Sequence, residues 1–134
     1  MAIEIPQPGR RSLQQIAVWE PRPWWGSQLQ HQFADGDVAV RECRQLPDVV
    51  GVAAEVVVVW ATDADAATFD GIAGLCGAGT GVFVVVVIPD ALRAAEWRLR
   101  DIGASVVVGE DVGADALAAI CRRALATVRN ERRE

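Results

Sequence analysis

Short runs of apolar residues, rich in valine, recur along the chain and are separated by longer segments of mixed polarity. Three runs are almost free of polar positions: residues 56–60, 82–88 and 105–109. Runs of this length, without alternation, are typical of strands buried on both faces of a parallel sheet. Residues 15–19 form a shorter run, and residues 37–43 alternate, as a strand at a sheet edge would. The pattern therefore predicts five β-strands.

The segments between these runs carry apolar residues at helical spacing. Trp25, Leu29 and Phe33 follow one another at intervals of four residues and predict the buried stripe of a first helix. Pro23 suits a position in the first turn of that helix. A second, short helix is predicted over residues 45–54. These two helices would connect the first three strands.

Three further helices are predicted in the second half of the chain. Residues 89–103 have the clearest helical pattern, with Asp90 as the N-cap and Gly103 at the end. Its buried stripe consists of Leu92, Ala95, Leu99 and Ile102. The helix over 65–76 would bury Phe69, Ile72, Ala73 and Cys76. The helix over 113–129 would bury Leu117, Ile120, Cys121, Ala124 and Val128.

Five strands that alternate with about five helices predict a three-layer α/β fold. Right-handed crossovers would then place all strands in one parallel sheet, and the flavodoxin-like order 2-1-3-4-5 is expected for five strands. A chain of 134 residues is most simply one domain. We assign this domain to residues 13–129, with residues 1–12 and 130–134 as solvated tails.

Composition excludes several classes of function. The net charge of −5 disfavours binding to nucleic-acid backbones, which requires a basic surface. All 13 basic residues are arginines, so mechanisms that need a lysine, including Schiff-base chemistry and the P-loop, are excluded. No Gly-x-Gly-x-x-Gly motif is present, and the single histidine, His31, is predicted to be exposed. We therefore expect no catalytic residue, no cofactor and no nucleic-acid partner.

The cysteines and the apolar runs indicate where the protein resides. Cys43, Cys76 and Cys121 are odd in number and widely separated, which argues against disulfides and zinc and fits a reducing compartment. No apolar run reaches the roughly 18 to 20 residues of a membrane span. The first 15 residues also lack the apolar core of a signal peptide. We therefore expect a cytoplasmic protein without a membrane partner.

The segment "RLRDIGASVVVGED" (98–111) resembles the fourth helix, Gly-Ala turn and fifth strand of the receiver domain of two-component response regulators. The order of the predicted elements agrees with that family over residues 13–128. The resemblance implies a phosphate-accepting site at the carboxyl ends of the strands. Whether this chain keeps such a site depends on the residues that stand at the family's functional positions.

Two of these positions follow the first and third strands. The family places an acidic pair after the first strand to hold Mg²⁺, and here Glu20 is followed by Pro21, so that one carboxylate remains. The family's phosphoryl-accepting aspartate ends the third strand, and the corresponding residue here is Trp60. A large apolar indole would thus stand where a carboxylate, a metal ion and a phosphate should meet.

Three more positions lie in or after the fourth and fifth strands. The family's Ser or Thr corresponds to Val87 or Ile88, and its lysine corresponds to Gly109 or Glu110. The aromatic switch residue of the fifth strand is absent, because that strand contains only valines. The resemblance therefore implies a degenerate pseudo-receiver, a receiver fold that lacks the phosphorylation residues.

Two aspartates follow Trp60 and have two interpretations. Asp65 precedes a predicted helix and suits its N-cap, and Asp63 is an alternative cap if the helix starts earlier. The other interpretation is a weak, vestigial Mg²⁺ site formed by Asp63 and Glu20, if the third strand runs further than predicted. Capping is the favoured interpretation.

Trp97 lies almost opposite the predicted stripe of its helix and should project into solvent. An exposed tryptophan among charged residues is typical of an anchor in a protein interface. The alternative is an isolated surface aromatic residue. Receiver relatives often pair through the face of helix four, strand five and helix five. We therefore predict an interaction surface that consists of Trp97, Arg93, Ala94, Arg100 and Asp101.

The resulting hypothesis is a non-catalytic pseudo-receiver that acts by protein–protein contact, as a homodimer or as a docking partner in a signalling pathway. One alternative is a flavodoxin-like domain that binds a small apolar or cationic molecule at the carboxyl ends of strands one and three. The crevice walls would be Trp24 and Trp60, with Glu20 and Asp63 nearby. The remaining alternative, an enzyme of unrecognised class, has no motif in its favour.

Overall fold

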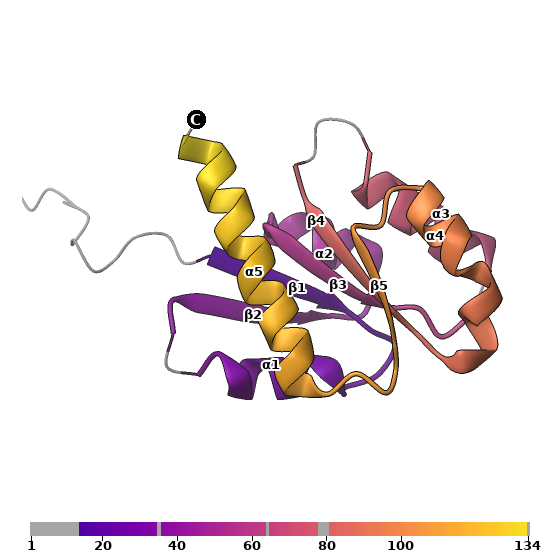
Figure 1. Cartoon of the computed structure of the whole chain (residues 1–134), viewed down its shortest axis with the longest axis horizontal. Helices are drawn as coiled ribbons and strands as arrows, with labels where there is room; N and C mark the ends of the chain where they lie inside the picture. The colour runs from indigo at the N-terminus through magenta and orange to yellow at the C-terminus, as the bar shows by residue number, and fades with distance from the viewer. Residues whose placement is uncertain (1–13, 35, 64, 78–80, 134) are drawn as a thin grey trace, which may run out of the picture.

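The computed structural model describes residues 14–34, 36–63, 65–77 and 81–133 (Figure 1). The expected tail at residues 1–12 lies outside the described residues. Five parallel strands form one sheet in the order β2-β1-β3-β4-β5, which confirms the predicted order and the edge position of the alternating strand. The strands are β1 (Gln14–Trp19), β2 (Val38–Cys43), β3 (Val56–Trp60), β4 (Phe83–Ile88) and β5 (Val106–Gly109).

Helices connect successive strands and cover both faces of the sheet. They are α1 (Trp25–Gln32), α2 (Leu46–Val52), α3 (Ala66–Leu75), the 3-10 helix η1 (Asp90–Ala95) that leads into α4 (Glu96–Asp101), and α5 (Ala114–Arg133). α5 continues four residues beyond Arg129, where the sequence predicts its end. In the described part of the chain, no helix combines the length and the apolar character needed to cross a bilayer.

Two apolar cores lie on the two faces of the sheet. On one face, Trp25 and Leu29 of α1 and Leu117 and Cys121 of α5 pack on the strands. On the other face, side chains of α2, α3 and α4 pack on the alternate strand positions. Figure 1 shows α5 crossing the first face, with α1 beside its amino-terminal end. All five residues of β3 are buried, as expected for the central strand of a three-layer fold.

The segment with the clearest helical pattern differs from its prediction. Residues 90–95 form a 3-10 helix, in which the Leu92 N–H donates to the Pro89 carbonyl, and only the following six residues are α-helical. Asp90 does not cap the helix, because its carboxylate pairs with Arg93 at 3.5 Å and the N-cap position belongs to Pro89. Of the predicted stripe, Leu99 is fully buried, and Leu92, Ala95 and Ile102 are half-buried and pack against the same core.

Two other helices differ from the expected pattern: α1 in where it begins, and α3 in which of its residues are buried. α1 begins at Trp25, so Pro23 lies before its first turn. In α3, Ala73 and Cys76 are only half-buried. Gly71 is buried instead, because its missing side chain leaves room for the Trp19 indole: a Cβ there would lie 2.6 Å from the ring. The buried face of α3 therefore includes Gly71, where the indole of β1 packs against the helix backbone.

Candidate functional site

The carboxyl ends of β1, β3 and β5 meet at one edge of the sheet, because all strands run parallel. Glu20 follows β1, Trp60 ends β3, and Glu110 follows β5 after Gly109. These are three of the positions at which the receiver resemblance implies functional residues. Their side chains determine what chemistry this edge can support.

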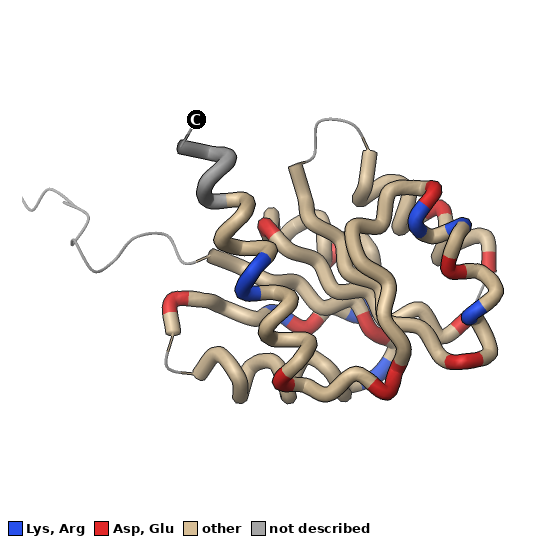
Figure 2. The backbone as a smooth tube through the Cα atoms, viewed as in Figure 1, with Lys and Arg blue, Asp and Glu red and all other residues tan. Residues whose placement is uncertain are grey.

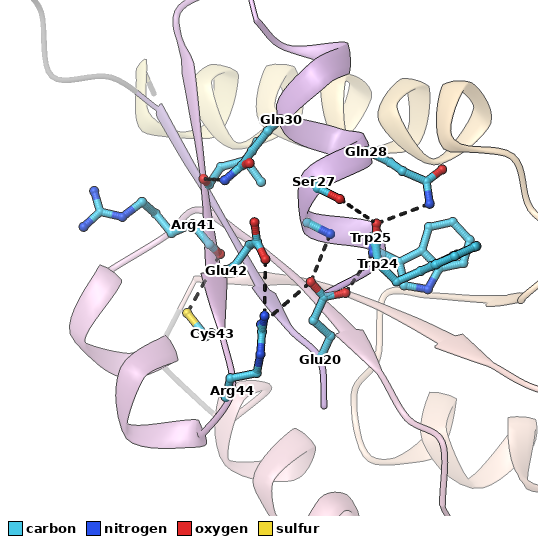
Figure 3. Close-up of polar contacts among 12 residues, drawn as sticks. Glu20, Trp24, Trp25, Ser27, Gln28, Gln30, Arg41, Glu42, Cys43 and Arg44 are labelled. Carbon is cyan, nitrogen blue, oxygen red and sulfur yellow. Dashed lines mark hydrogen bonds and ion pairs between the residues drawn. The ribbon is translucent and has the colours of Figure 1, made fainter. Parts of the chain in front are cut away.

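Glu20 is fully buried and serves the start of α1. Its two carboxylate oxygens accept hydrogen bonds from the backbone N–H groups of Trp25, at 2.8 Å, and Gly26, at 3.1 Å. Figure 3 shows Arg44, from the end of β2, pointing toward the same carboxylate, with Nη1 3.9 Å from Oε2. A carboxylate is favourable at a helix N-terminus, where unpaired N–H groups and the helix dipole meet. Glu20 therefore acts as the cap of α1.

Gly26 makes this arrangement sterically possible. A Cβ at this position would lie 2.8 Å from Oε2 of Glu20 and even closer to Cγ of Glu42. Glu42 in turn pairs with Arg44 at 3.4 Å. The first turn of α1 thus approaches two carboxylates closely, and only a glycine leaves room for both.

Trp60 and Glu110 form a direct bond between the ends of β3 and β5. The indole Nε1 of Trp60 donates a hydrogen bond of 2.6 Å to Oε2 of Glu110. The ring of Trp25 meets that of Trp60 edge to face, at 6.3 Å and 87°. The guanidinium of Arg22 lies 4.6 Å from the centroid of the Trp60 ring. An indole and a carboxylate from the ends of two different strands are therefore joined by a hydrogen bond at this edge of the sheet.

Trp60 and Glu110 were each singled out by the receiver resemblance, but their mutual bond was not predicted. The signal in the sequence was chemical: an indole is only a donor and a carboxylate only an acceptor. Fifty residues separate the two side chains, and only the parallel sheet brings them together. The aromatic partner Trp25 was predicted as a core residue, which its burial confirms.

A hollow of about 240 Å³ opens beside this pair and is termed the tryptophan hollow; its lining residues are Arg22, Trp24, Trp25, Trp60 and Glu110. Both proposed crevice walls, Trp24 and Trp60, border it. Trp24 is 52% exposed and lies 6.5 Å from Trp25, centroid to centroid. Among the described residues, Nε1 of Trp25 is the one buried side-chain nitrogen or oxygen without a hydrogen-bond partner.

Asp63 and Glu20, the two candidate metal ligands, border different environments. Asp63 is exposed and lines a second hollow of about 170 Å³, together with Arg44 and Thr68. Glu20 is not among the residues that line this hollow, and both of its oxygens face the α1 amides. Across the described part of the chain, no group of three or more His, Cys, Asp or Glu side chains is arranged to hold a metal ion.

Of the two aspartates that follow Trp60, Asp65 is the one that caps a helix. Its Oδ1 accepts a hydrogen bond of 2.8 Å from the Thr68 N–H, and Asp65 occupies the N-cap of α3, as predicted. Hydrogen bonds from Thr68, first from its side chain and then from its backbone, hold the pKa of the Asp65 carboxyl below its usual range. This carboxylate therefore stabilises the start of α3.

Trp97 is 66% exposed, as helical geometry predicts. Its predicted neighbours Arg93, Ala94, Arg100 and Asp101 are exposed as well. Arg100 pairs with Glu96 one turn earlier, at 2.9 Å. The helix therefore presents a large apolar side chain between charges of both signs. We term these five predicted residues the α4 surface.

Cys43 and Cys121 are buried, Cys76 is half-buried, and all three thiols are free. Burial raises the pKa of all three thiols, and for Cys121 to about 12. Thiols with raised pKa values are poor nucleophiles at neutral pH. The structure thus agrees with the interpretation of these cysteines as small core residues.

Comparisons with models of known protein families and with curated proteins return no match. Solved structures, in contrast, share the fold. A signal receiver domain from Vibrio parahaemolyticus, described as part of a LuxO repressor, is 11% identical with a TM-score of 0.75; the match covers 89% of this chain and 95% of that one. The DrrB receiver domain, activated with BeF3, is 16% identical with a TM-score of 0.71 and coverages of 85% and 98%.

A pilus assembly-related protein from Burkholderia pseudomallei is 18% identical to the chain, with a TM-score of 0.68 and coverages of 86% and 91%. These similarities extend over nearly the whole length of each neighbour. They establish that the chain has the fold of response-regulator receiver domains, with its five strands in the same order.

Proposed function

We propose that the chain is a non-catalytic, receiver-like signalling module that acts through protein–protein contact and is not phosphorylated by the usual aspartyl route. The observation that carries this proposal is the Trp60–Glu110 hydrogen bond at the carboxyl edge of the sheet. Phosphoryl transfer depends on fixed positive charge around the transferring oxygens. By the resemblance, the indole of Trp60 corresponds to the acceptor aspartate, and Gly109 or Glu110 corresponds to the family's lysine, so that neither position supplies the expected charge.

The arrangement of Glu20 supports the same conclusion. In the receiver family the acidic residues after the first strand hold Mg²⁺, and Glu20 is what remains of them. Its oxygens accept two backbone hydrogen bonds from α1 in a fully buried position. Turning this carboxylate away from α1 toward a metal ion would leave two N–H groups at the helix start without an acceptor, which is costly in a buried site.

The contact surface that we propose is the α4 surface, and its proposed occupant is a second copy of this chain. Figure 2 shows basic and acidic residues interleaved along the region of α4. A surface that carries both Arg100 and Asp101 beside Trp97 is complementary to itself under a two-fold rotation. A central tryptophan with charged neighbours is also the usual composition of an interface hot spot.

An NMR titration of the purified chain with Mg²⁺ and beryllofluoride tests the loss of phosphorylation. We expect no shift of the Trp60 indole N–H or of the backbone amides that follow β1, β3 and β5. A saturable shift of these signals that requires both Mg²⁺ and beryllofluoride would overturn the proposal, because it would show a working phosphate site.

Light scattering tests the contact surface. We expect the mass of a dimer for the chain, and the mass of a monomer for Trp97→Ala. Trp24→Ala, which removes another exposed indole, and Val50→Ala, which changes a side chain as exposed as Trp97, are the matched controls and should remain dimeric. A chain that is monomeric throughout, or a dimer that Trp97→Ala does not dissociate, would refute self-association through the α4 surface.

A further inference from the structure

The tryptophan hollow is independent of the α4 surface and has the chemistry of a cation site. The faces of its indole rings carry negative electrostatic potential, which attracts organic cations. The carboxylate of Glu110, exposed at its margin, adds a full negative charge. With a volume of about 240 Å³, the hollow is small by the standard of drug-like sites and large enough for one planar side-chain head group.

The chain already places a guanidinium against the Trp60 ring, at the wall of this hollow. Arg22 belongs to the connection between β1 and α1, is exposed, and lies 4.6 Å from the centroid of the Trp60 ring. Within the described residues, this ring contact is the one interaction of the Arg22 side chain. An exposed arginine held by a single cation–π contact is easily displaced.

Trp25 adds a second requirement for the ligand. Its indole lines the hollow, is 97% buried, and has an N–H without an acceptor among the described residues. A buried donor without a partner is energetically unfavourable, so a ligand oxygen that reaches this N–H once Arg22 has moved gains by supplying an acceptor. The Arg22 guanidinium, which has only donors, cannot supply it.

We propose that the tryptophan hollow binds an external guanidinium group with a carbonyl or carboxylate oxygen on the same molecule, as in an arginine residue or a small arginine derivative. Arg22 is then the guanidinium that the ligand displaces from the Trp60 ring. Glu110 and the Trp60 ring hold the guanidinium, and the oxygen accepts from Nε1 of Trp25. This site requires neither phosphorylation nor dimerisation, so it stands or falls separately from the proposed function.

Competition between Arg22 and the ligand for the Trp60 ring leads to a prediction that would not hold for a pocket without such a competitor. An occupant that must leave before the ligand enters lowers the apparent affinity by its own occupancy. Removing it with Arg22→Ala should therefore tighten binding, by about fivefold for one exposed cation–π contact. Glu110→Gln should weaken binding by about the same factor or more, because it removes the negative charge.

The experiment is an NMR titration of the full chain with N-acetyl-arginine amide, followed at the indole N–H signals of Trp60 and Trp25. Trp97→Ala is the matched control, because it removes an indole elsewhere and should leave the affinity unchanged. We expect saturable shifts of both signals, tighter binding to Arg22→Ala and weaker binding to Glu110→Gln. The valine methyl spectrum of each variant shows that it remains folded.

Further ligands define the source of the guanidinium. Free arginine and an arginine-containing tripeptide should both bind, and whichever binds more tightly identifies the source as a metabolite or a peptide. Methylguanidinium, which lacks the oxygen, should bind more weakly and leave the Trp25 signal in place. Sodium acetate should cause no shift. The proposal is wrong if no ligand gives saturable shifts, if acetate reproduces them, or if Arg22→Ala fails to tighten binding.

Discussion

α1 and α4 follow strands of the same sheet, and each has a tryptophan among its first two residues, yet the two indoles differ completely in environment. Trp25 opens α1 and is 3% exposed, whereas Trp97 is the second residue of α4 and is 66% exposed. α1 begins on the buried carboxylate of Glu20. α4 begins from a 3-10 turn and has no side-chain cap.

The difference shows why α1 is packed into the core whereas α4 remains largely exposed. Glu20 fixes where α1 starts, so that Trp25 and Leu29 point at the sheet and pack beside α5. α4 fully buries only Leu99 among its own residues, and Arg100 pairs with Glu96 on its exposed side. A helix with so little buried surface contributes little to the stability of the domain. Its outer side is therefore available for contacts with other molecules.

The largest expected effect is the difference in the free energy of unfolding between Trp25→Ala and Trp97→Ala. Trp25→Ala should lower the free energy of unfolding by about 4 kcal/mol, because it leaves a large cavity between α1, α5 and the sheet. Trp97→Ala should change it by less than about 0.5 kcal/mol, because the side chain has no buried contacts to lose. Urea unfolding, followed by circular dichroism at a concentration where the chain is monomeric, measures both.

Trp25→Phe is the conservative control for the first substitution. It keeps an aromatic ring in the core and removes the N–H that has no acceptor, so its cost should be well below that of alanine. Equal losses for Trp25→Ala and Trp97→Ala would contradict the contrast between the two helices.

The next effect concerns the carboxylates at the starts of the two helices. Glu20→Ala should cost about 3 kcal/mol, since it leaves the buried N–H groups of Trp25 and Gly26 without their acceptor. Glu96→Ala removes only an exposed pair with Arg100 and should cost about 0.5 kcal/mol or less. Urea unfolding of both variants at neutral pH gives the two values.

Glu20→Gln refines this test. The amide retains one acceptor oxygen, so its cost should lie between those of the wild type and Glu20→Ala. A loss for Glu20→Ala no greater than that for Glu96→Ala would show that the start of α1 does not depend on this cap.

Local patterns predicted most of the fold. The valine runs encode strands buried on both faces, and the order of elements along the chain then restricts the sheet to few topologies. Asp65 as the cap of α3 and Trp97 as an exposed residue also follow from local spacing. Each of these features depends on residues that are close to one another in the sequence, so the sequence pattern shows it directly.

The features that escaped prediction depend on residues from separate elements. Trp60 and Glu110 bond across 50 residues, and the Trp19 ring packs where a side chain at position 71 would lie. The capping role of Glu20 also escaped prediction, although its partners Trp25 and Gly26 are only five and six residues away, because the chain between them folds back on itself. Such pairings depend on the path of each crossover, which periodicity does not specify.

The last effect is a dependence on pH that distinguishes the α1–α5 core from the α4 region. Burial raises the pKa of Cys121 to about 12, above its ordinary value of about 9. Between these pH values the folded chain retains a proton that the unfolded chain has released. The stabilisation is complete below pH 9 and decreases as pH rises toward 12, by up to about 1.4 kcal/mol per pH unit.

The amino-acid composition of the chain leaves few other side chains to titrate in this pH range. The chain contains no lysine and no tyrosine, and arginine remains protonated, so the cysteines are the side chains that titrate in this range. Urea unfolding at pH 8, 9, 10 and 11 should therefore show a falling free energy that Cys121→Ala flattens. Cys76 is half-buried and contacts the C-terminal end of the α4 region at Gly103, so Cys76→Ala should flatten it less. If the two variants show equal slopes, burial in the α1–α5 core does not control the alkaline stability.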